Sequence, residues 1–185
     1  ISRFNISKTK VMDLEIFIPS LKEQTTIGNF FRQLDAAIAS HQRKLERVKE
    51  LKKSLLQKMF PKDGEAFPEL RFPNFTDAWE QRKLGELYKK NTERNELKFP
   101  IEKTISIAKM VFNPEGNGAL SESLVNYRVL RVGDIAFEGH KNKDFLFGRF
   151  VLNDVGNGIM SPRFSSLRPI EYLNISFWKQ YIHYE

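Results

Sequence analysis

The chain has 185 residues, of which 41% are hydrophobic and 16 are phenylalanine, and it carries a formal net charge of +7. This composition supplies enough apolar surface for a folded core and excludes a wholly disordered chain. The absence of cysteine excludes disulfides and thiolate metal sites, and it favours a cytoplasmic protein. No run reaches the roughly 18 apolar residues of a membrane span, so we expect no membrane partner.

The positive charge is concentrated in one stretch of the sequence. Residues 22–59 hold nine Lys or Arg side chains against four Asp or Glu. Such a basic surface either steers a polyanion or is an ordinary solvated face, and the charge alone leaves both interpretations open.

The N-terminal residues predict a short strand. Residues 11–18 alternate in polarity, with Leu14, Ile16 and Ile18 on one face. This period of two indicates a half-buried strand, which a proline then ends. Because the sequence begins at Ile1, within what reads as an extended segment, we expect the chain to be a fragment.

A long helix is predicted over residues 22–60, and the capping-box spacing of Ser20 and Glu23 marks its start. One set of positions in it recurs with alternating gaps of four and three residues, which is the coiled-coil period of 3.5. These helix-seam positions are Ile27, Phe31, Leu34, Ile38, His41, Leu45, Val48, Lys52, Leu55 and Met59. A seam has no core of its own, so we expect a second helix to cover it. Its polar members, His41 and Lys52, favour a register-setting or solvent-reaching role over a ligand or catalytic one.

Residues 61–78 read as a joint between this helix and the next domain. Prolines and a glycine end the helix there and limit flexing. The joint is rich in aromatic side chains, namely Phe67, Phe72, Phe75 and, just past it, Trp79. We interpret them as fixing the joint onto the helix end and the domain wall, although a simple core edge of that domain explains any single aromatic equally well.

The remaining residues, 79–185, predict a mixed domain with both strands and helix, so the fold class is α+β. Short extended runs separated by turns are expected at 104–112, 127–132, 134–137, 145–152 and 164–168. Helical spacing then returns through Ile175, Trp178 and Ile182.

Catalytic and metal-binding motifs are not found in the sequence. The stretches "GNGAL" and "GNGIM" lack the downstream glycine and lysine of a phosphate loop. The three histidines stand far apart, without a carboxylate or histidine at metal-ligand spacing. Two nuclease-like Glu-x-Lys triplets, at 50–52 and 96–98, have no partnered aspartate nearby. We therefore expect no catalytic residue and no metal.

Two long motifs resemble one protein family. Residues 14–60, "LEIFIPSLKEQTTIGNFFRQLDAAIASHQRKLERVKELKKSLLQKMF", resemble the end of a target-recognition domain and the conserved helix of the specificity subunit of type I restriction–modification systems. Residues 70–87, "LRFPNFTDAWEQRKLGEL", resemble the start of the next recognition domain in that family. The weaker motifs "RVGDIAFEG" and "GIMSPRFSSLRP" are similar to segments inside such a domain.

The resemblance implies a domain organisation and a function. Residues 1–21 would be the tail of a preceding target-recognition domain, 22–60 a conserved spacer helix, 61–78 the joint, and 79–185 the front part of a second recognition domain. The family protein is a non-catalytic DNA-recognition and scaffold subunit whose helix length sets the spacing of two DNA half-sites. It docks methyltransferase subunits, which carry S-adenosylmethionine, and through them an ATP- and magnesium-dependent restriction subunit. We expect this chain itself to bind none of these cofactors.

Two other functions remain open. The family protein has two recognition domains and two antiparallel helices, whereas this chain has one helix. It could therefore be a truncated coiled-coil assembly or competitor subunit without independent DNA binding. A stand-alone nuclease has only the Glu-x-Lys triplets in its favour.

Two groups of side chains are candidate DNA contacts. Base edges are best read by long donors and amides, and such side chains occur on and beside a glycine-led loop: His140, Lys141, Asn142, Lys143, Arg149 and Arg163. Phosphates would be met by Lys109, Arg128 and Arg131, which lie on or beside candidate strands. The alternatives are an ordinary solvated turn for the first group and ion pairs with Glu115 or Glu122 for the second.

An antiparallel homodimer is the expected assembly of the fragment. The helix would be about 57 Å long, and the 19 residues of 60–78 reach at most about 63 Å. Folding the strand at 11–18 back onto the chain's own domain would pull this joint almost straight and leave its aromatics unburied. A second helix in a longer parent chain is the main rival for the place beside the seam.

Overall fold

A computed structural model describes residues 8–116, 118, 120–139 and 149–182. The chain divides into two compact units, Ile1–Lys53 and Ser54–Glu185, and each is described by itself.

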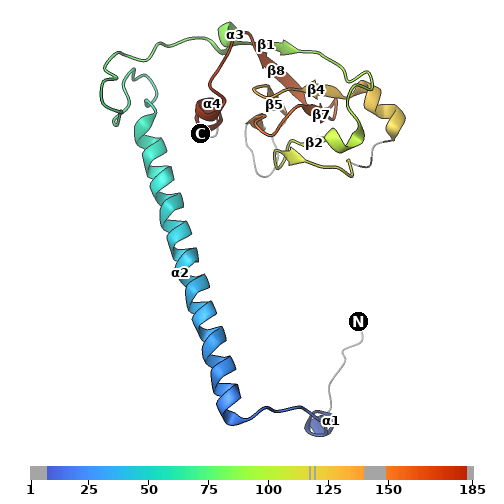
Figure 1. Ribbon diagram of the computed structural model, residues 1–185. Helices are drawn as coiled ribbons and strands as arrows, with labels where there is room; N and C mark the ends of the chain where they lie inside the picture. The colour runs from blue at the N-terminus through green and yellow to red at the C-terminus, as the bar shows by residue number, and fades with distance from the viewer. Residues whose placement is uncertain (1–7, 117, 119, 140–148, 183–185) are drawn as a thin grey trace. The chain divides into compact units, whose positions relative to one another are not determined.

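The described part of the first unit consists of helix α1, the segment after it and most of helix α2, whose last residues belong to the second unit (Figure 1). Helix α1 spans Lys8–Met12, and helix α2 begins at Leu21 and runs to Met59 as one continuous helix of 39 residues. The backbone N–H of Glu23 donates to Ser20 Oγ at 3.3 Å, so the predicted cap of the long helix is confirmed. Gln24 Nε2 adds a bond to the carbonyl of Pro19 at 2.8 Å.

The strand predicted over residues 11–18 is not formed in the structure. Its first two residues end α1, and residues 13–20 have no regular secondary structure. Leu14, Ile16 and Ile18 remain 66–72% exposed. A strand needs a neighbour to take its backbone hydrogen bonds, and the described residues place none beside this segment.

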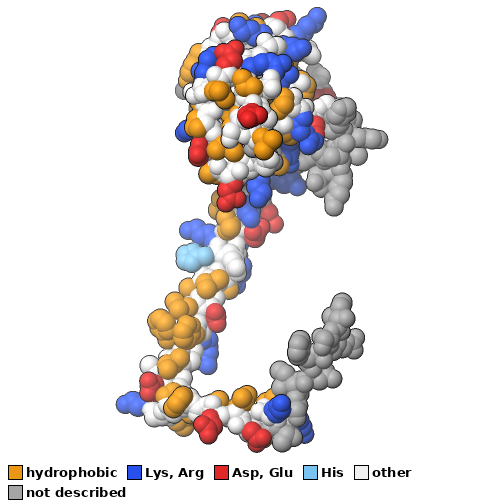
Figure 2. All heavy atoms as spheres, turned by 90° about the vertical axis from the view of Figure 1, so that its right-hand side faces the viewer, with side chains coloured by type: hydrophobic (Ala, Val, Ile, Leu, Met, Phe, Trp, Pro, Cys, Tyr) orange, Lys and Arg blue, Asp and Glu red, His pale blue; other side chains and the backbone are white. Residues whose placement is uncertain are grey.

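The helix seam predicted from the 3.5-residue period is uncovered. No residue of α2 is buried, and its apolar seam residues from Ile27 to Leu55 are 37–57% exposed, whereas Met59 at its end is partly buried. Hydrophobic side chains consequently show on the surface of the helix in Figure 2. Most helical stability in proteins comes from packing an apolar face, and the described residues leave this face of α2 unpacked.

The second unit is an α+β domain, as predicted, with short strands (Figure 1). Its main sheet has the order β1-β8-β5-β6, and β2–β3 and β4–β7 form two antiparallel pairs. The strands are β1 Tyr88–Asn91, β2 Ile105–Ser106, β3 Val111–Phe112, β4 Arg128–Leu130, β5 Ile135–Phe137, β6 Phe150–Leu152, β7 Gly158–Met160 and β8 Ser165–Pro169. The helices are α3 Leu84–Leu87, the 3-10 turns η1 Ile101–Lys103 and η2 Ser121–Asn126, and α4 Ile175–Ile182.

Most of the predicted extended runs contain a strand. Those at 127–132 and 134–137 contain β4 and β5, and the run at 164–168 overlaps β8. The described end of the run at 145–152 contains β6, and the expected C-terminal helix is α4. The run at 104–112 is instead two short strands, because a turn closes between them, with Met110 N bonded to Ser106 O at 2.7 Å. Strands β1 and β7 were not predicted.

The core of the second unit lies where the short strands meet. Leu130, Ile105 and Met160 form one cluster with neighbours from β5 and β6. Ile135 and Leu152 form another, against which Trp178 of α4 packs. Strand β7 is buried throughout and carries glycine at its first position.

Candidate nucleic-acid interface and docking surfaces

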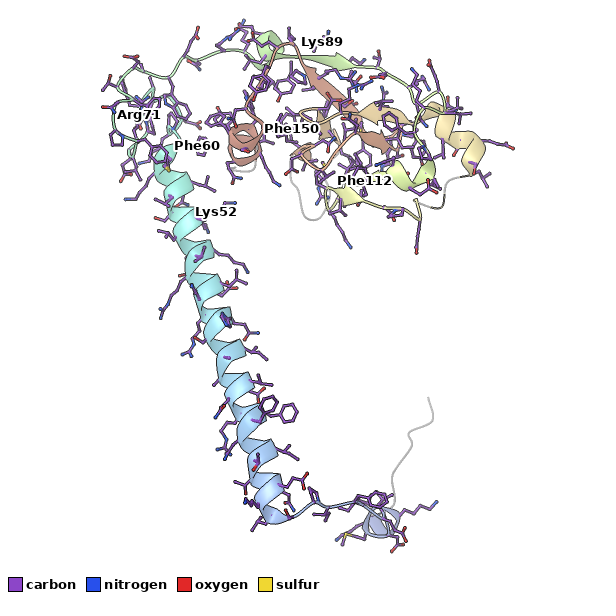
Figure 3. The ribbon with its side chains drawn as sticks, viewed as in Figure 1. Lys52, Phe60, Arg71, Lys89, Phe112 and Phe150 are labelled. Carbon is purple, nitrogen blue, oxygen red and sulfur yellow. The ribbon has the colours of Figure 1, made fainter. Side chains whose placement is uncertain are left out.

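The loop expected to read bases connects β5 to β6. These strands pair antiparallel, with Phe137 opposite Phe150, so they form a hairpin whose connecting end is the glycine-led loop. Figure 3 labels Phe150 on this hairpin. His140, Lys141, Asn142 and Lys143 all lie outside the described residues, so their predicted contacts rest on the sequence.

The two arginines expected beside that loop converge on the mouth of the hairpin. Arg149 Nη1 donates to the carbonyl of Ile107 at 3.3 Å, and its own carbonyl accepts from the N–H of Glu138 at 2.9 Å. The Arg163 guanidinium pairs with the carboxylate of Glu138 and lies 5.1 Å from the ring centre of Phe164. The structure therefore brings Arg149 and Arg163 together through Glu138, which sequence reasoning had not singled out.

The three predicted phosphate contacts have different surroundings. Lys109 is exposed on the turn between β2 and β3. Arg128 is partly buried, and its Nη1 donates to the carbonyl of Asn91 at 3.5 Å. Arg131 forms a two-pronged ion pair with Glu93, at 2.8 and 3.3 Å. Arg131 therefore forms an ion pair, as the alternative expected, but with Glu93 and not with Glu115 or Glu122. The contact of Arg131 with phosphate stays a prediction.

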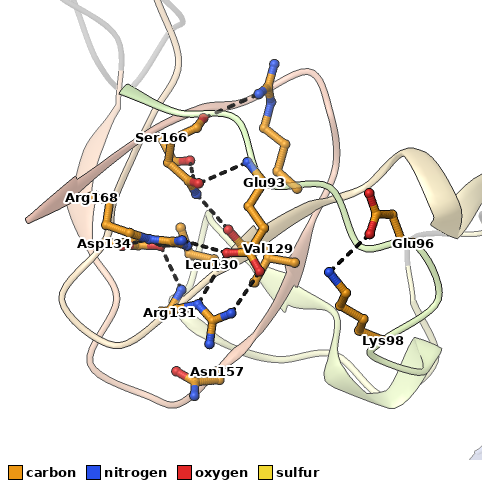
Figure 4. A network of polar contacts seen from close by, with 12 residues as sticks. Glu93, Glu96, Lys98, Val129, Leu130, Arg131, Asp134, Asn157, Ser166 and Arg168 are labelled. Carbon is orange, nitrogen blue, oxygen red and sulfur yellow. Dashed lines mark hydrogen bonds and ion pairs between the residues drawn. The ribbon is translucent and has the colours of Figure 1, made fainter. Parts of the chain in front are cut away.

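Arg131 belongs to a polar network that joins three segments of the domain, at Glu93, at Arg131 and Asp134, and at Arg168 (Figure 4). Arg168 on β8 donates to Asp134 at 2.9 Å and to Glu93 at 2.6 Å. Asp134 is almost fully buried and also accepts from the backbone N–H of Arg131 at 2.8 Å. Each carboxylate in the network is therefore met by charged or backbone donors, as a buried charge requires.

The network shifts the ionisation of its members. Hydrogen bonds from Arg131, opposed by burial and aided by Arg168, lower the pKa of Glu93 from 4.5 to about 2. Hydrogen bonding to Asp134 raises the pKa of Arg168 despite partial burial. Both shifts favour the charged forms of Glu93 and Arg168.

Replacing Glu93 with glutamine is expected to lower the free energy of unfolding at pH 7 by about 1–3 kcal/mol, because two guanidinium groups lose a charged acceptor. The pKa of Glu93 is depressed, so its stabilisation is fully present above pH 4.5 and is lost as the pH falls toward 2. Urea unfolding at pH 7 and near pH 2 should therefore show a difference that shrinks in acid. Glu96→Gln, which loses only an exposed pair with Lys98, is the control, with a change below about 0.5 kcal/mol. A Glu93 effect that is independent of pH would contradict the assignment.

The aromatic joint is tied to the end of α2 by its backbone and by one of its four predicted aromatics. Leu70 N donates to Lys58 O at 2.8 Å. Trp79 meets the ring of Phe60 edge to face at 6.0 Å, and Phe60 also contacts Phe177 of α4. The other three predicted aromatics, Phe67, Phe72 and Phe75, are more than half exposed, and their role in fixing the joint stays a prediction.

Beside the exposed aromatics lies an apolar pocket of about 440 Å³. Figure 3 labels two of its lining residues, Phe60 and Arg71. The walls come from the end of α2, the joint and α4: Leu56, Met59, Phe60, Pro68, Leu70, Arg71, Phe72, Phe75, Trp79, Phe177 and Gln180. The pocket is large enough for several aliphatic side chains. The contributions of Phe60 and α4 were missed, although the four-residue spacing of Phe177 and Tyr181 was visible in the sequence.

Two possible site types are not seen in the part of the chain that the structure describes. Its acidic and histidine side chains form no group of three or more placed to hold a metal ion. None of its helices combines the length and apolar character that crossing a membrane requires.

Comparison with known proteins gives three matches. Residues 2–50 match the family model described as "Type I restriction modification DNA specificity domain". The curated "Putative type I restriction enzyme MjaX specificity subunit" of Methanocaldococcus jannaschii is 26% identical over 121 residues, which cover 64% of this chain and 26% of that protein. The crystal structure of the HsdS subunit from Thermoanaerobacter tengcongensis superposes with a TM-score of 0.50 and 16% identity, covering 90% of this chain and 42% of the other.

The matches agree on one class of protein. The family model and the curated relative are both described as specificity proteins of type I restriction–modification systems, and the solved structure shows that the fold is shared. The resemblance inferred from the sequence is therefore confirmed as a similarity to these proteins. The matched part of this chain spans about a quarter of the curated relative, 26% of its length.

Proposed function

We propose that the chain is a non-catalytic specificity component of a type I restriction–modification enzyme that recognises double-stranded DNA. The observation that carries this proposal is the joining of a 39-residue helix with an uncovered apolar seam to a small α+β domain. The seam serves assembly, and the domain serves recognition. The family-model match supports the assignment.

The recognition surface is proposed to lie at the β5–β6 hairpin. Its loop supplies His140, Lys141, Asn142 and Lys143 for base edges, since amides and long donors make the discriminating contacts. Arg149 and Arg163 would contribute there once DNA competes with the carboxylate of Glu138. The phosphate contacts would come from Lys109, Arg128 and Arg131, which position the domain without reading sequence.

The helix is proposed to bind the catalytic partners. Methyltransferase subunits with S-adenosylmethionine would dock on or beside α2, and an ATP- and magnesium-dependent restriction subunit would join through them. The continuous helix would set the distance between two recognition domains, and the bonds that tie the joint to its end, such as Leu70 N to Lys58 O, would keep that distance defined.

Two copies of this chain are proposed to pair through antiparallel α2 helices. The alternating gaps of four and three residues are the same when the seam is followed from either end. One antiparallel register therefore places every seam residue of one copy opposite a seam residue of the other. In that register the facing pairs are Ile27–Met59, Phe31–Leu55, Leu34–Lys52, Ile38–Val48 and His41–Leu45. The two polar residues then each face a leucine, and the isologous interface of a twofold dimer covers both seams at once.

Alanine at Lys141, Asn142 and Lys143 together is expected to reduce target modification by a reconstituted methyltransferase complex at least about 100-fold, because each base contact contributes roughly 1–3 kcal/mol. The control is Lys89→Ala with Lys90→Ala, two exposed lysines on β1. Methylation rate at the target site is the measurement. Unchanged modification by the loop variant would show that this loop does not read the sequence.

A competitor subunit without its own DNA binding is the second candidate, favoured by the exposed seam. DNA binding measured with and without a methyltransferase subunit separates the two. A chain that binds the methyltransferase but never DNA supports the competitor.

A further inference from the structure

Arg163 is an exposed arginine whose orientation is constrained in three ways. Its side chain is 67% exposed, and its Nη2 pairs with Oε1 of Glu138. The guanidinium carbon lies 5.1 Å from the ring centre of Phe164, which is the distance of a cation–π contact. The backbone is fixed as well, because Phe164 N donates to Ser161 O at 3.2 Å and closes a turn that has Pro162 as its second residue.

Glu138 is the fixed member of this ion pair. Its side chain is only 16% exposed, and its backbone N–H donates to the carbonyl of Arg149 at 2.9 Å, just past the β5–β6 pairing. Strands β5 and β8 pair with Phe137 opposite Ser165, so the register of the sheet brings Glu138 beside the turn that carries Arg163. The carboxylate therefore has a set position, and the arginine is oriented toward it.

Stability does not account for this arrangement. An ion pair with an arginine this exposed is screened by water and adds little to the free energy of folding. Its larger effect is on the guanidinium, because a side chain already held in one orientation loses less entropy when it makes a further contact. The ion pair thus prepares Arg163 for a second partner.

Most of the guanidinium is left for that partner. The group has five N–H donors in one plane, and among the described residues Glu138 alone accepts from it, at Nη2. Two parallel N–H donors match O6 and N7 of guanine in the major groove, the commonest specific arginine–base contact. The carboxylate also offsets the charge of Arg163. A phosphate would therefore have to displace Glu138, whereas the neutral acceptors of guanine can share the guanidinium with it.

We propose that Arg163 reads a guanine in the DNA target and that Glu138 positions its guanidinium for this contact. Glu138 is a positioning residue, which acts through Arg163 and does not touch the base. Its place agrees with this role, because it directly follows β5 at the end of the hairpin where the recognition surface is proposed. This inference rests on the proposed function, and it names the base and the pair of side chains that select it.

Base preference measured one position at a time tests the pair. A reconstituted methyltransferase complex is given DNA targets in which each position of the recognition site is varied, and the methylation rates are compared. Arg163→Ala is expected to reduce the preference for guanine at one position by about 5- to 150-fold and to leave the other positions unchanged. Glu138→Gln is expected to reduce it at the same position by about three- to tenfold, because a neutral amide holds the guanidinium less firmly.

A double-mutant cycle distinguishes positioning from an independent effect of Glu138. Since Glu138 acts through Arg163, Glu138→Gln should change the base preference no further once Arg163 is alanine. The matched control is an exposed arginine–glutamate pair elsewhere in the domain, Arg82 with Glu86. Arg82→Ala and Glu86→Gln should leave the preference at every position unchanged, and circular dichroism checks that all variants are folded.

The outcomes separate this inference from the proposed function. An equal loss of affinity for all sequences, with a salt slope lower by about one, makes Arg163 a phosphate contact and overturns the inference. An Arg163→Ala complex with unchanged preference, a relaxed position that is not guanine, or a Glu138→Gln complex with full preference also overturns it. In each of these cases the wild-type complex still recognises its site, so the proposed function stands. A wild-type complex without any base preference overturns both.

Discussion

Replacing Ile38 with aspartate is expected to convert the dimer of this chain into a monomer. In the proposed register Ile38 faces Val48 of the other copy, and the symmetry places two such layers in each dimer. A carboxylate in an apolar layer without a partner costs several kcal/mol, so the Kd of dimerisation should rise at least about 1,000-fold. Sedimentation velocity over a range of concentrations measures this change, with circular dichroism to follow helix content.

Ala36→Asp is the matched control for this substitution. It introduces the same side chain two residues earlier, on the face of α2 opposite to the seam. Only the helix propensity of one position is lost, which costs about 0.7 kcal/mol or less. The Ala36 variant should stay dimeric, and a dimer that survives Ile38→Asp would show that the seam is not the interface.

Salt dependence separates self-association from binding to DNA. Residues 22–59 of each copy carry nine basic against four acidic side chains, so two paired helices repel one another. Screening weakens that repulsion, and the dimer should tighten as salt is raised. Binding to DNA through phosphates must instead weaken with salt. The basic character of the helix therefore opposes the homodimer while favouring an anionic partner.

The helix could be predicted from the sequence because its signals are local. The cap at Ser20 and the 3.5-residue period from Ile27 onward depend only on neighbours along one turn or two. The strand predicted at 11–18 has an equally clear alternation, yet a strand is completed only by another strand. No described segment supplies that neighbour. Two equally clear sequence patterns therefore had different outcomes: the helix predicted from residue 22 is formed, and the strand predicted at 11–18 is an exposed segment.

Some short strands of the second unit formed where the sequence showed no strand signal. Strand β1 contains two consecutive lysines and an asparagine, which is a poor strand pattern, and it forms because it pairs with β8 and buries its end residues Tyr88 and Asn91. Strand β7 is buried on all sides, so it shows no alternation. Both depend on pairings between residues far apart in the sequence, which periodicity does not report.

The partners of the candidate DNA-contact residues could also not be predicted from the sequence. Ion pairs with Glu115 or Glu122 were the alternative considered for Arg131, and no pair was predicted for Arg163, but the fold brings Glu93 and Glu138 to them from 38 and 25 residues away. A basic residue near a strand is thus a weak predictor of a phosphate contact. Among the phosphate candidates, Arg131 would have to exchange Glu93 for a phosphate, Arg128 bonds a backbone carbonyl, and Lys109 is exposed.

Replacing Gly158 with alanine is expected to destabilise the second unit strongly. A Cβ built at this position would lie 2.3 Å from the carbonyl oxygen of Lys103 and 3.0 Å from two side-chain carbons of Ile105. Real contacts of this kind do not occur at 2.3 Å, so the backbone of one strand must move. Movement is opposed because Ile159 next to it is fully buried and bridges to Thr104.

The cost should be about 3 kcal/mol or more, which lowers the Tm by roughly 10 °C. Thermal and urea unfolding can be followed by the fluorescence of Trp79 and Trp178, which both lie in this unit. Gly85→Ala is the control, since a Cβ there meets nothing within 4 Å, and its effect should stay within about 0.5 kcal/mol. Equal stability of the two variants would mean that β7 does not run against Lys103 as the structure has it. The backbones at Gly158 and Lys103 would then not lie in close contact, and this contact would not hold β4 and β7 onto the rest of the core.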